Sequence, residues 1–208
     1  MHSSLPRVLL VGANGVIGKH LVRALAPTYQ IITAGLADAE LMMDLSQVAS
    51  ICSALQQAGP LDAIVCTAGR ANFSPLSNIN AAQGDDSLYA FGLRDKLMGQ
   101  VNLALASRGI LRRAGSITLT SGTTSDDPIL GGSSLSMVNG ALEAWVRAAA
   151  TEWPDEVRLN LVSPSLVEGT PASAANAFPG IPVMPGERVA QSYLRCLGSG
   201  IRGQTIRV

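Results

Sequence analysis

Residues 7–26 read RVLLVGANGVIGKHLVRALA, and this stretch decides the fold. It opens with a short apolar run, 7–11, whose β-branched residues favour a buried strand. Residues 16–26 follow the helical pattern, with apolar side chains on one face. Between the two segments lie three glycines, Gly12, Gly15 and Gly18. The stretch therefore predicts a strand, a tight turn and a helix in direct succession.

The same alternation continues along the chain. Further strands are expected at 30–34, 41–45, 61–69, 115–122, 157–164 and 204–208. Further helices are expected at 46–59, 87–109, 136–153 and 187–198. Apolar strands that alternate with helices indicate a parallel sheet covered on both faces. We therefore expect an α/β fold, a Rossmann-type doubly wound parallel sheet of about seven strands with helices on both faces.

The length of 208 residues fits a single domain, 1–208. One segment, 168–186, is rich in proline, alanine and glycine and follows neither the strand nor the helix period. A loop of this length inside a compact domain is usually a lid or a binding loop. We expect it to form the loop that covers the substrate.

Charged residues make up 14% of the chain, apolar residues 47%, and the formal net charge is +0. This composition does not favour binding to nucleic acid or to an acidic membrane, because both need a basic face. It favours a surface covered by copies of the same chain. The cysteines match no zinc spacing, so no metal is expected. No apolar run approaches the ~18 residues of a membrane span, and residues 1–6 do not resemble a secretory signal, so a cytoplasmic protein is expected.

The three glycines suit a binding site as well as a turn. Glycine at a turn allows tight backbone geometry, and glycine at a helix start lets a pyrophosphate approach the unpaired N–H groups there. The position between a first strand and a first helix is the context that a dinucleotide-binding turn requires. We expect the turn to contact NAD or NADP through Gly12, Asn14, Gly15, Val16, Ile17 and Gly18. The alternative is a turn with a purely structural role.

The choice between NAD and NADP is open. An acidic residue usually ends the second strand of an NAD enzyme, where it holds the ribose 2′-hydroxyl. Gly35 and Leu36 occupy that place, and no arginine stands there for a 2′-phosphate. Asp38 lies nearby in the following loop, where a solvated acid is at least as good an interpretation. Asn14 is a candidate donor to a 2′-oxygen or to a 2′-phosphate.

Several pieces of the chain together carry a family resemblance. They are GANGVIG (12–18), MDL (43–45), TAG (67–69), GSITLTSG (115–122), the helix from 136 and RLNLVSPSLVEGT (158–170). With these pieces the chain resembles the short-chain dehydrogenase/reductase family over nearly its whole length. The resemblance implies an oxidoreductase that uses NAD or NADP on a small carbonyl or alcohol substrate. It also implies cofactor contacts from Asp44, Leu45, Ala68, Gly69, Pro164, Ser165 and Val167.

The catalytic part of the resemblance departs from the family pattern. Active members carry an Asn-Ser-Tyr-Lys set, in which the tyrosine protonates the carbonyl and the lysine lowers the tyrosine pKa. Here Lys96 takes the asparagine place and Gly122 the serine place, while Leu135 and Asn139 stand for tyrosine and lysine. No Tyr-x-x-x-Lys exists anywhere in the chain. The chain is most similar to a small atypical branch that shares SPL (74–76), KLMGQVNL (96–103) and NGALEAW (139–145) in similar form.

Three residues are candidates for the missing chemistry. Lys96 is one of only two lysines and stands in an apolar stretch, where burial would lower its pKa toward neutrality and suit acid–base work. Its alternative is an ion pair with Asp95 or Glu143, or exposure to solvent. Ser121 could orient a substrate oxygen, although strand-end hydroxyls usually satisfy backbone groups. Asn139 could bond a ribose hydroxyl or simply occupy the helix surface.

Trp145, Trp153, Leu142 and Val146 recur at helical spacing. The resemblance implies that this helix packs against a copy of itself, so a homodimer or homotetramer is expected, and a core role is the alternative. Three hypotheses for the function result: an oxidoreductase with a divergent active site, a dinucleotide sensor without redox activity, or a non-redox isomerase or cyclase on the same scaffold.

Overall fold

The computed structural model describes residues 5–153 and 157–208. Within these residues, seven strands form one sheet in the order β3-β2-β1-β4-β5-β6-β7, and every neighbouring pair is parallel. The strands are β1 (Arg7–Val11), β2 (Gln30–Gly35), β3 (Leu41–Met42), β4 (Leu61–Cys66), β5 (Leu111–Thr120), β6 (Arg158–Ser163) and β7 (Thr205–Arg207). The expected parallel sheet of about seven strands is confirmed.

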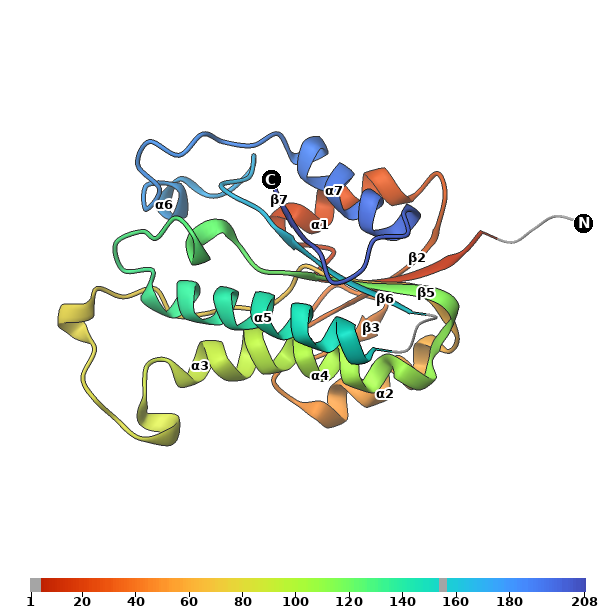
Figure 1. The fold of residues 1–208 in the computed structure, drawn as a ribbon, viewed down its shortest axis with the longest axis horizontal. Helices are drawn as coiled ribbons and strands as arrows, with labels where there is room; N and C mark the ends of the chain where they lie inside the picture. Colours follow the sequence, from red (N-terminus) through yellow and green to blue (C-terminus); the bar gives the residue numbers. More distant parts are fainter. Residues whose placement is uncertain (1–4, 154–156) are drawn as a thin grey trace, which may run out of the picture.

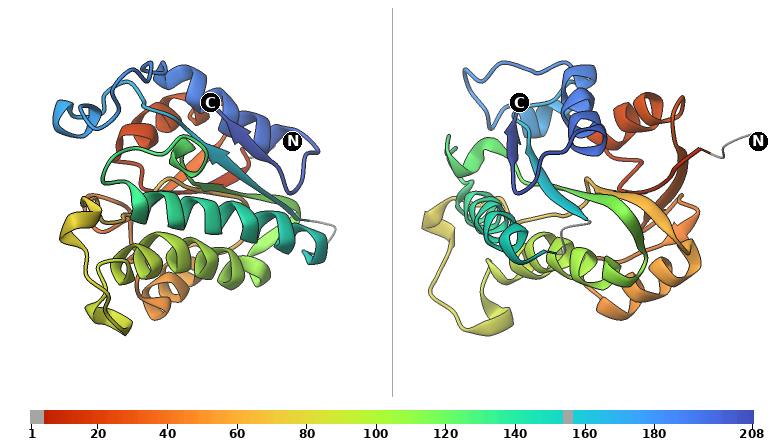
Figure 2. Two further views of the ribbon diagram at one scale, coloured as in Figure 1. Left: turned by 60° about the vertical axis from the view of Figure 1, so that its left-hand side comes forward. Right: turned by 45° about the vertical axis from the view of Figure 1, so that its right-hand side comes forward.

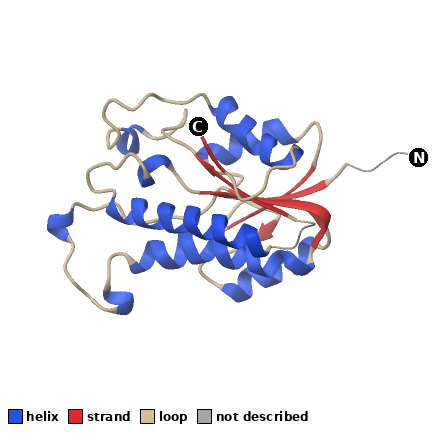
Figure 3. Ribbon diagram, in the orientation of Figure 1, coloured by secondary structure: helices blue, strands red, loops and turns tan. Residues whose placement is uncertain are grey.

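Helices cover both faces of this sheet, as Figures 1 and 3 show. One face carries α1 (Val16–Leu25) and α7 (Gly186–Gly198). The other carries α2 (Val48–Ala58), α4 (Gly99–Ala106) and α5 (Ser133–Glu152). The short helices α3 (Ala90–Gly92) and α6 (Ala172–Ala175) lie in the long connections.

Strand β1 shows why both faces need cover. Leu9 and Val11 pack in the core beneath α2, α4 and α5, whereas Val8 and Leu10 pack in the core beneath α1 and α7. All four side chains are fully buried. A strand in a half-exposed sheet would alternate apolar with polar residues, but a strand buried on both sides is apolar throughout. The uninterrupted apolar run of this strand is therefore explained by its central position.

The element boundaries differ from the expectation at several places. The predicted strand at 41–45 shortens to Leu41–Met42, and β5 begins four residues early, at Leu111. Helix α5 begins at Ser133 rather than 136, so Leu135 is already helical. The helix expected over 87–109 is interrupted, because the stretch Leu93–Met98 between α3 and α4 is π-helical.

Because the strands are parallel, their carboxyl ends meet at one edge of the sheet. The long loops after β4, β5 and β6 all gather at this edge, on the left of Figure 1 and again on the left of the first view in Figure 2. The order of strands reverses between β1 and β4, and a crevice opens where it does. This crevice holds the candidate site. Among the described residues, no helix is both long enough and apolar enough to cross a membrane.

Candidate functional site

The glycine turn after β1 is packed too closely for any side chain at two of its positions. A Cβ on Gly18 would lie 2.1 Å from the carbonyl oxygen of Gly12. Gly12 itself has φ +90, and a Cβ there would lie 2.9 Å from the backbone N of Ala68. The turn closes through a hydrogen bond from Gly15 N to Gly12 O of 3.1 Å. Helix α1 therefore starts directly against the ends of β1 and β4, with its N–H groups facing the crevice.

The crevice contains two cavities, one on each side of the α1 N-terminus. The first, called here the turn cavity, has a volume of about 380 Å³. Among the residues expected to bind the cofactor, it is lined by Gly12, Asn14, Gly15, Gly35, Leu36, Asp44, Leu45, Ala68 and Gly69. Sequence reasoning missed Arg70 and Asp95, which also line it and form an ion pair of 3.1 Å.

The second cavity, called here the lysine cavity, has a volume of about 220 Å³. It brings together the three candidate catalytic residues, Lys96, Ser121 and Asn139. The expected cofactor residues Val16, Ile17, Pro164, Ser165 and Val167 line it as well. Leu135, at the place of the family tyrosine, also faces it. Of the predicted site residues, Gly18 alone lines neither cavity. Its missing side chain allows the close packing of the glycine turn.

Asn14 makes two hydrogen bonds that the sequence did not predict. Its side-chain amide donates to the carbonyl oxygens of Ala37, at 3.3 Å, and Asp38, at 2.9 Å. These bonds hold the loop after β2 against the glycine turn. The amide N–H groups therefore have acceptors in the described structure, and the side chain lines the turn cavity, where the cofactor contact stays a prediction.

Lys96 is 9% exposed and stands in the π-helical stretch. Its Nζ donates to the carbonyl oxygen of Ser121 at 3.1 Å. Asp95 pairs instead with Arg70, and Glu143 with Arg207, so the structure shows neither the alternative ion pair nor a solvent-facing lysine. Burial lowers the Lys96 pKa to about 8, while the nearby Cys66 acts weakly in the opposite direction. An ammonium in this cavity can therefore release and regain a proton near neutral pH.

Lys96 depends on a glycine to reach this position. A Cβ on Gly69, which has φ +129, would lie 2.9 Å from Lys96 Cγ. The lysine stem thus lies directly on the turn after β4. The same burial also affects Cys66, whose thiol pKa is raised to about 12 and which stays protonated at neutral pH.

Asn139 and Gly122 fit together in a similar way. A Cβ on Gly122 would lie only 3.0 Å from Asn139 Nδ2, closer than an ordinary contact. Asn139 Nδ2 donates to Thr124 Oγ1 at 2.9 Å, a partner that sequence reasoning missed. Its Oδ1 is buried, and no described residue donates to it. A buried acceptor without a donor is costly, so this oxygen is a candidate acceptor for a ligand hydroxyl or amide.

Ser121 lines the lysine cavity, but its hydroxyl is engaged with a buried carboxylate. Its Oγ donates to Glu143 Oε1 at 2.9 Å. The hydroxyls of Ser125, at 2.9 Å, and Ser163, at 3.2 Å, donate to the same oxygen. Glu143 is 3% exposed and reaches this point from the middle of α5. In the described structure, Ser121 therefore contributes its carbonyl to Lys96 and its hydroxyl to Glu143.

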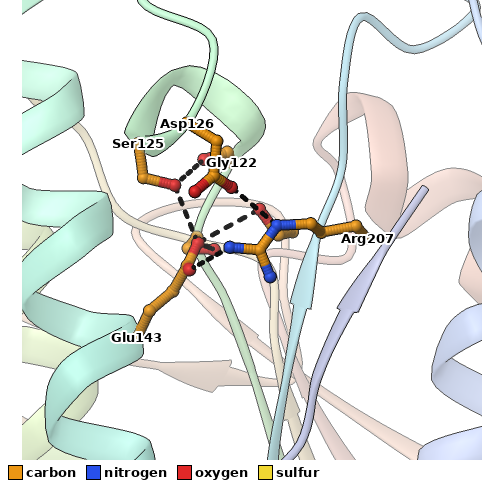
Figure 4. A network of polar contacts seen from close by, with 7 residues as sticks. Gly122, Ser125, Asp126, Glu143 and Arg207 are labelled. Carbon is orange, nitrogen blue, oxygen red and sulfur yellow. Dashed lines mark hydrogen bonds and ion pairs between the residues drawn. The ribbon is translucent and has the colours of Figure 1, made fainter.

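Arg207 completes this network from the far end of the chain, as Figure 4 shows. Its Nη2 lies 2.9 Å from Glu143 Oε2, and its Nε lies 2.6 Å from Asp126 Oδ2. The guanidinium holds the pKa of Asp126 below its usual range. One carboxylate thus joins the ends of β5, β6 and β7 next to the lysine cavity. No local sequence signal predicts this contact, because its partners are 64 residues apart.

Comparison with known proteins adds a family model described as enoyl-(acyl carrier protein) reductase, which matches residues 8–198. The crystal structure of the protein lin1944 from Listeria innocua superposes with a TM-score of 0.92 at 33% identity, covering 98% of this chain and 99% of that one. A small-chain dehydrogenase in complex with NADPH reaches 0.84 at 24% identity, covering 99% and 97%. At 24% identity, this similarity shows that the two chains share a fold.

A curated relative is the short-chain dehydrogenase/reductase ATR9 of Stachybotrys chlorohalonatus. It is 35% identical over 106 residues, which cover 51% of this chain. The matched stretch spans 40% of that relative's length. A short-chain dehydrogenase from Burkholderia cenocepacia in complex with NADP shares the fold, with a TM-score of 0.83 at 19% identity over 98% of this chain and 96% of that one.

Replacing Glu143 by alanine is expected to lower the free energy of unfolding by about 3 kcal/mol, because three serine hydroxyls and Arg207 lose their buried acceptor. The free energy of unfolding of Glu143→Gln should lie between the values for this variant and for the unaltered protein, since the amide oxygen still accepts hydrogen bonds from the serines. Denaturant unfolding measures both, with Glu152→Ala as the exposed control on the same helix. A Glu143→Ala value equal to that of the control would contradict the proposed stabilising role.

Proposed function

We propose a function for this chain from its family: it belongs to the short-chain dehydrogenase/reductase family. In this proposal it is an oxidoreductase that binds NAD or NADP in the two cavities of the crevice. The reaction is hydride transfer between the nicotinamide and a carbonyl or alcohol substrate. The single observation that carries the proposal is Lys96, a buried amine with a lowered pKa in the cavity beside the glycine turn.

The residues present fit a dinucleotide. The glycine turn leaves a cradle that a Cβ would fill, and the N-terminus of α1 faces it, which suits a pyrophosphate. The buried Asn139 Oδ1 in the lysine cavity suits a ribose hydroxyl or a carboxamide N–H. When bound, the nicotinamide supplies or accepts the hydride. NADP-bound dehydrogenases share this fold, which favours NADP. Arg70, the one cation in the described lining of the turn cavity, follows β4 rather than β2.

Lys96 takes the role of the acid in this proposal. Of the three N–H donors of an ammonium, the described structure commits one, to Ser121 O. Another N–H is then available to the substrate oxygen. As hydride reaches the carbonyl carbon, negative charge develops on that oxygen, and the ammonium stabilises it and donates the proton. In the reverse direction the neutral amine accepts the proton from the alcohol.

The assembly that we propose is a homodimer or homotetramer formed across the outer faces of α4 and α5. Between these helices lies an open cavity of about 510 Å³, lined in part by Leu105, Arg108 and Trp145. Arg108 stacks over the Trp153 ring at 4.7 Å, and the two tryptophans pack edge to face. Leu142 and Val146 are fully buried in the core, so for these two the alternative role holds.

Cofactor binding and hydride transfer are tested in two steps. Titration of NADPH and of NADH, followed by cofactor fluorescence, should show saturable binding. The exposed Gly15→Asp variant should abolish it by placing a carboxylate at the pyrophosphate site, whereas Gly200→Asp should not. The 4-deuterated reduced cofactor, incubated with a panel of ketones and aldehydes, should then transfer deuterium to a product alcohol. Binding without any transfer would contradict the oxidoreductase and favour a sensor.

The role of Lys96 predicts a pH dependence. Reduction requires the protonated amine, so kcat/KM for the carbonyl should be constant below the pKa of about 8 and fall tenfold per pH unit above it. Lys96→Met should lower kcat by roughly 10²–10⁴-fold and remove this alkaline limb. Lys96→Arg should keep the charge but also remove the limb, since a guanidinium does not titrate there. An unchanged limb in Lys96→Met would assign it to another group.

The proposed assembly predicts a change of mass. Ala148 is exposed on α5 and lines the cavity between the helices. Ala148→Glu should shift the sedimentation mass toward the monomer, because a carboxylate would be buried at an apolar contact. Ala26→Glu, an exposed position at the end of α1, is the matched control and should leave the mass unchanged. A monomeric mass for the unaltered protein would contradict the proposal.

A further inference from the structure

A third hollow lies beside the lysine cavity and has a larger volume, about 710 Å³. We name it the tail groove. Its walls come from three loops that follow β4, β5 and β6. The lining residues are Phe73, Asp127, Pro128, Ile129, Leu130, Ser173, Asn176, Ala177, Pro179, Gly180 and Ile181.

The tail groove and the lysine cavity share a wall. Phe178 lines the lysine cavity, while its two neighbours, Ala177 and Pro179, line the tail groove. On the opposite side, the backbone of Asp127, in the groove, donates to the carbonyl of Thr123, in the cavity, at 2.8 Å. The loop 168–186, expected to be the substrate loop, therefore borders both spaces, with Phe178 at the boundary between them.

The lysine cavity is too small to hold a cofactor ring and a whole substrate. Its volume of about 220 Å³ lies below the roughly 300–1,000 Å³ of ordinary ligand pockets. Under the proposed function it must accept both the nicotinamide and the reacting carbon and oxygen. The rest of a substrate must lie elsewhere, and the adjoining tail groove offers the space.

The walls of the groove are mostly apolar, apart from Asp127, Ser173 and Asn176, and a backbone hydrogen bond joins two of the loops. Ser74 N donates to Gly131 O at 2.9 Å, and the Phe73 ring lies against Gly131, where a Cβ would be 3.2 Å from Phe73 Cζ. Leu130 is 93% exposed and Phe73 is 51% exposed, so both present large apolar side chains to a ligand in the groove. Asp127 is the one charged residue in the described lining.

We propose that the tail groove binds the apolar, uncharged tail of the substrate while its carbonyl or hydroxyl end lies at Lys96. This inference rests on the proposed function and specifies its substrate class. The substrate is a neutral molecule with a polar head and an aliphatic tail. Acyl chains carried on anionic groups are disfavoured, because the described lining offers Asp127 and no cation to meet them.

Binding of a homologous series of ketones tests the groove without requiring turnover. Calorimetry would measure the Kd of 2-pentanone, 2-heptanone, 2-nonanone and 2-undecanone, with the protein alone and saturated with NADP. Full burial of a methylene group lowers Kd by about fourfold, so a half-open groove should lower Kd by about twofold for each added methylene. The anionic 8-oxononanoate should bind at least about tenfold more weakly than 2-nonanone.

Two leucine variants locate the effect. Leu130→Ser should flatten the chain-length dependence, while leaving the Kd of 2-pentanone unchanged. Leu76 is a second leucine, 67% exposed, outside the groove lining, so Leu76→Ser should behave as the unaltered protein. A Kd independent of chain length, equal effects of the two variants, or equal binding of 8-oxononanoate would each overturn the inference. Failure of deuterium transfer would overturn the proposed reaction and leave these binding results as a separate outcome.

Discussion

The packing of the central strands on both faces is the constraint from which the rest of the molecule follows. Because β1 and β4 are apolar on both sides, each must be covered by helices above and below the sheet. Every connection then crosses over to a parallel strand, and all strand ends meet at one edge. The reversal of strand order between β1 and β4 leaves that edge open at its centre. Both cavities of the candidate site lie in this opening.

Close packing at the crevice makes residues that are far apart in the sequence depend on one another. Lys96 reaches the cavity only because Gly69 offers no side chain, and Asn139 has room for its amide because Gly122 offers none. Asn139 and Gly122, which stand at the places of the family lysine and serine, therefore fit one another. The proposed acid, Lys96, thus comes from the π-helical stretch, whereas the family tyrosine would stand on α5, at Leu135.

The parts of the structure that could be predicted are those with a local pattern. The run at 7–11 and the glycines after it predicted β1, the turn and α1, and the missing Tyr-x-x-x-Lys was visible at Leu135 and Asn139. The contact between Glu143 and Arg207 could not be predicted, because it depends on how β7 docks beside β6. The acceptor of the Ser121 hydroxyl could not be predicted for the same reason, since Glu143 belongs to another element.

The π-helical stretch Leu93–Met98 has a consequence for how such a site can arise. A π-turn holds one residue more than an α-turn, and each residue of an α-helix turns the chain by about 100°. Deleting one residue between Lys96 and α4 would restore the regular helix and rotate the lysine out of its cavity. A point substitution to lysine in an uninterrupted helix would have pointed elsewhere. The position of Lys96 therefore depends on the extra residue of the π-helical stretch as well as on the lysine side chain itself.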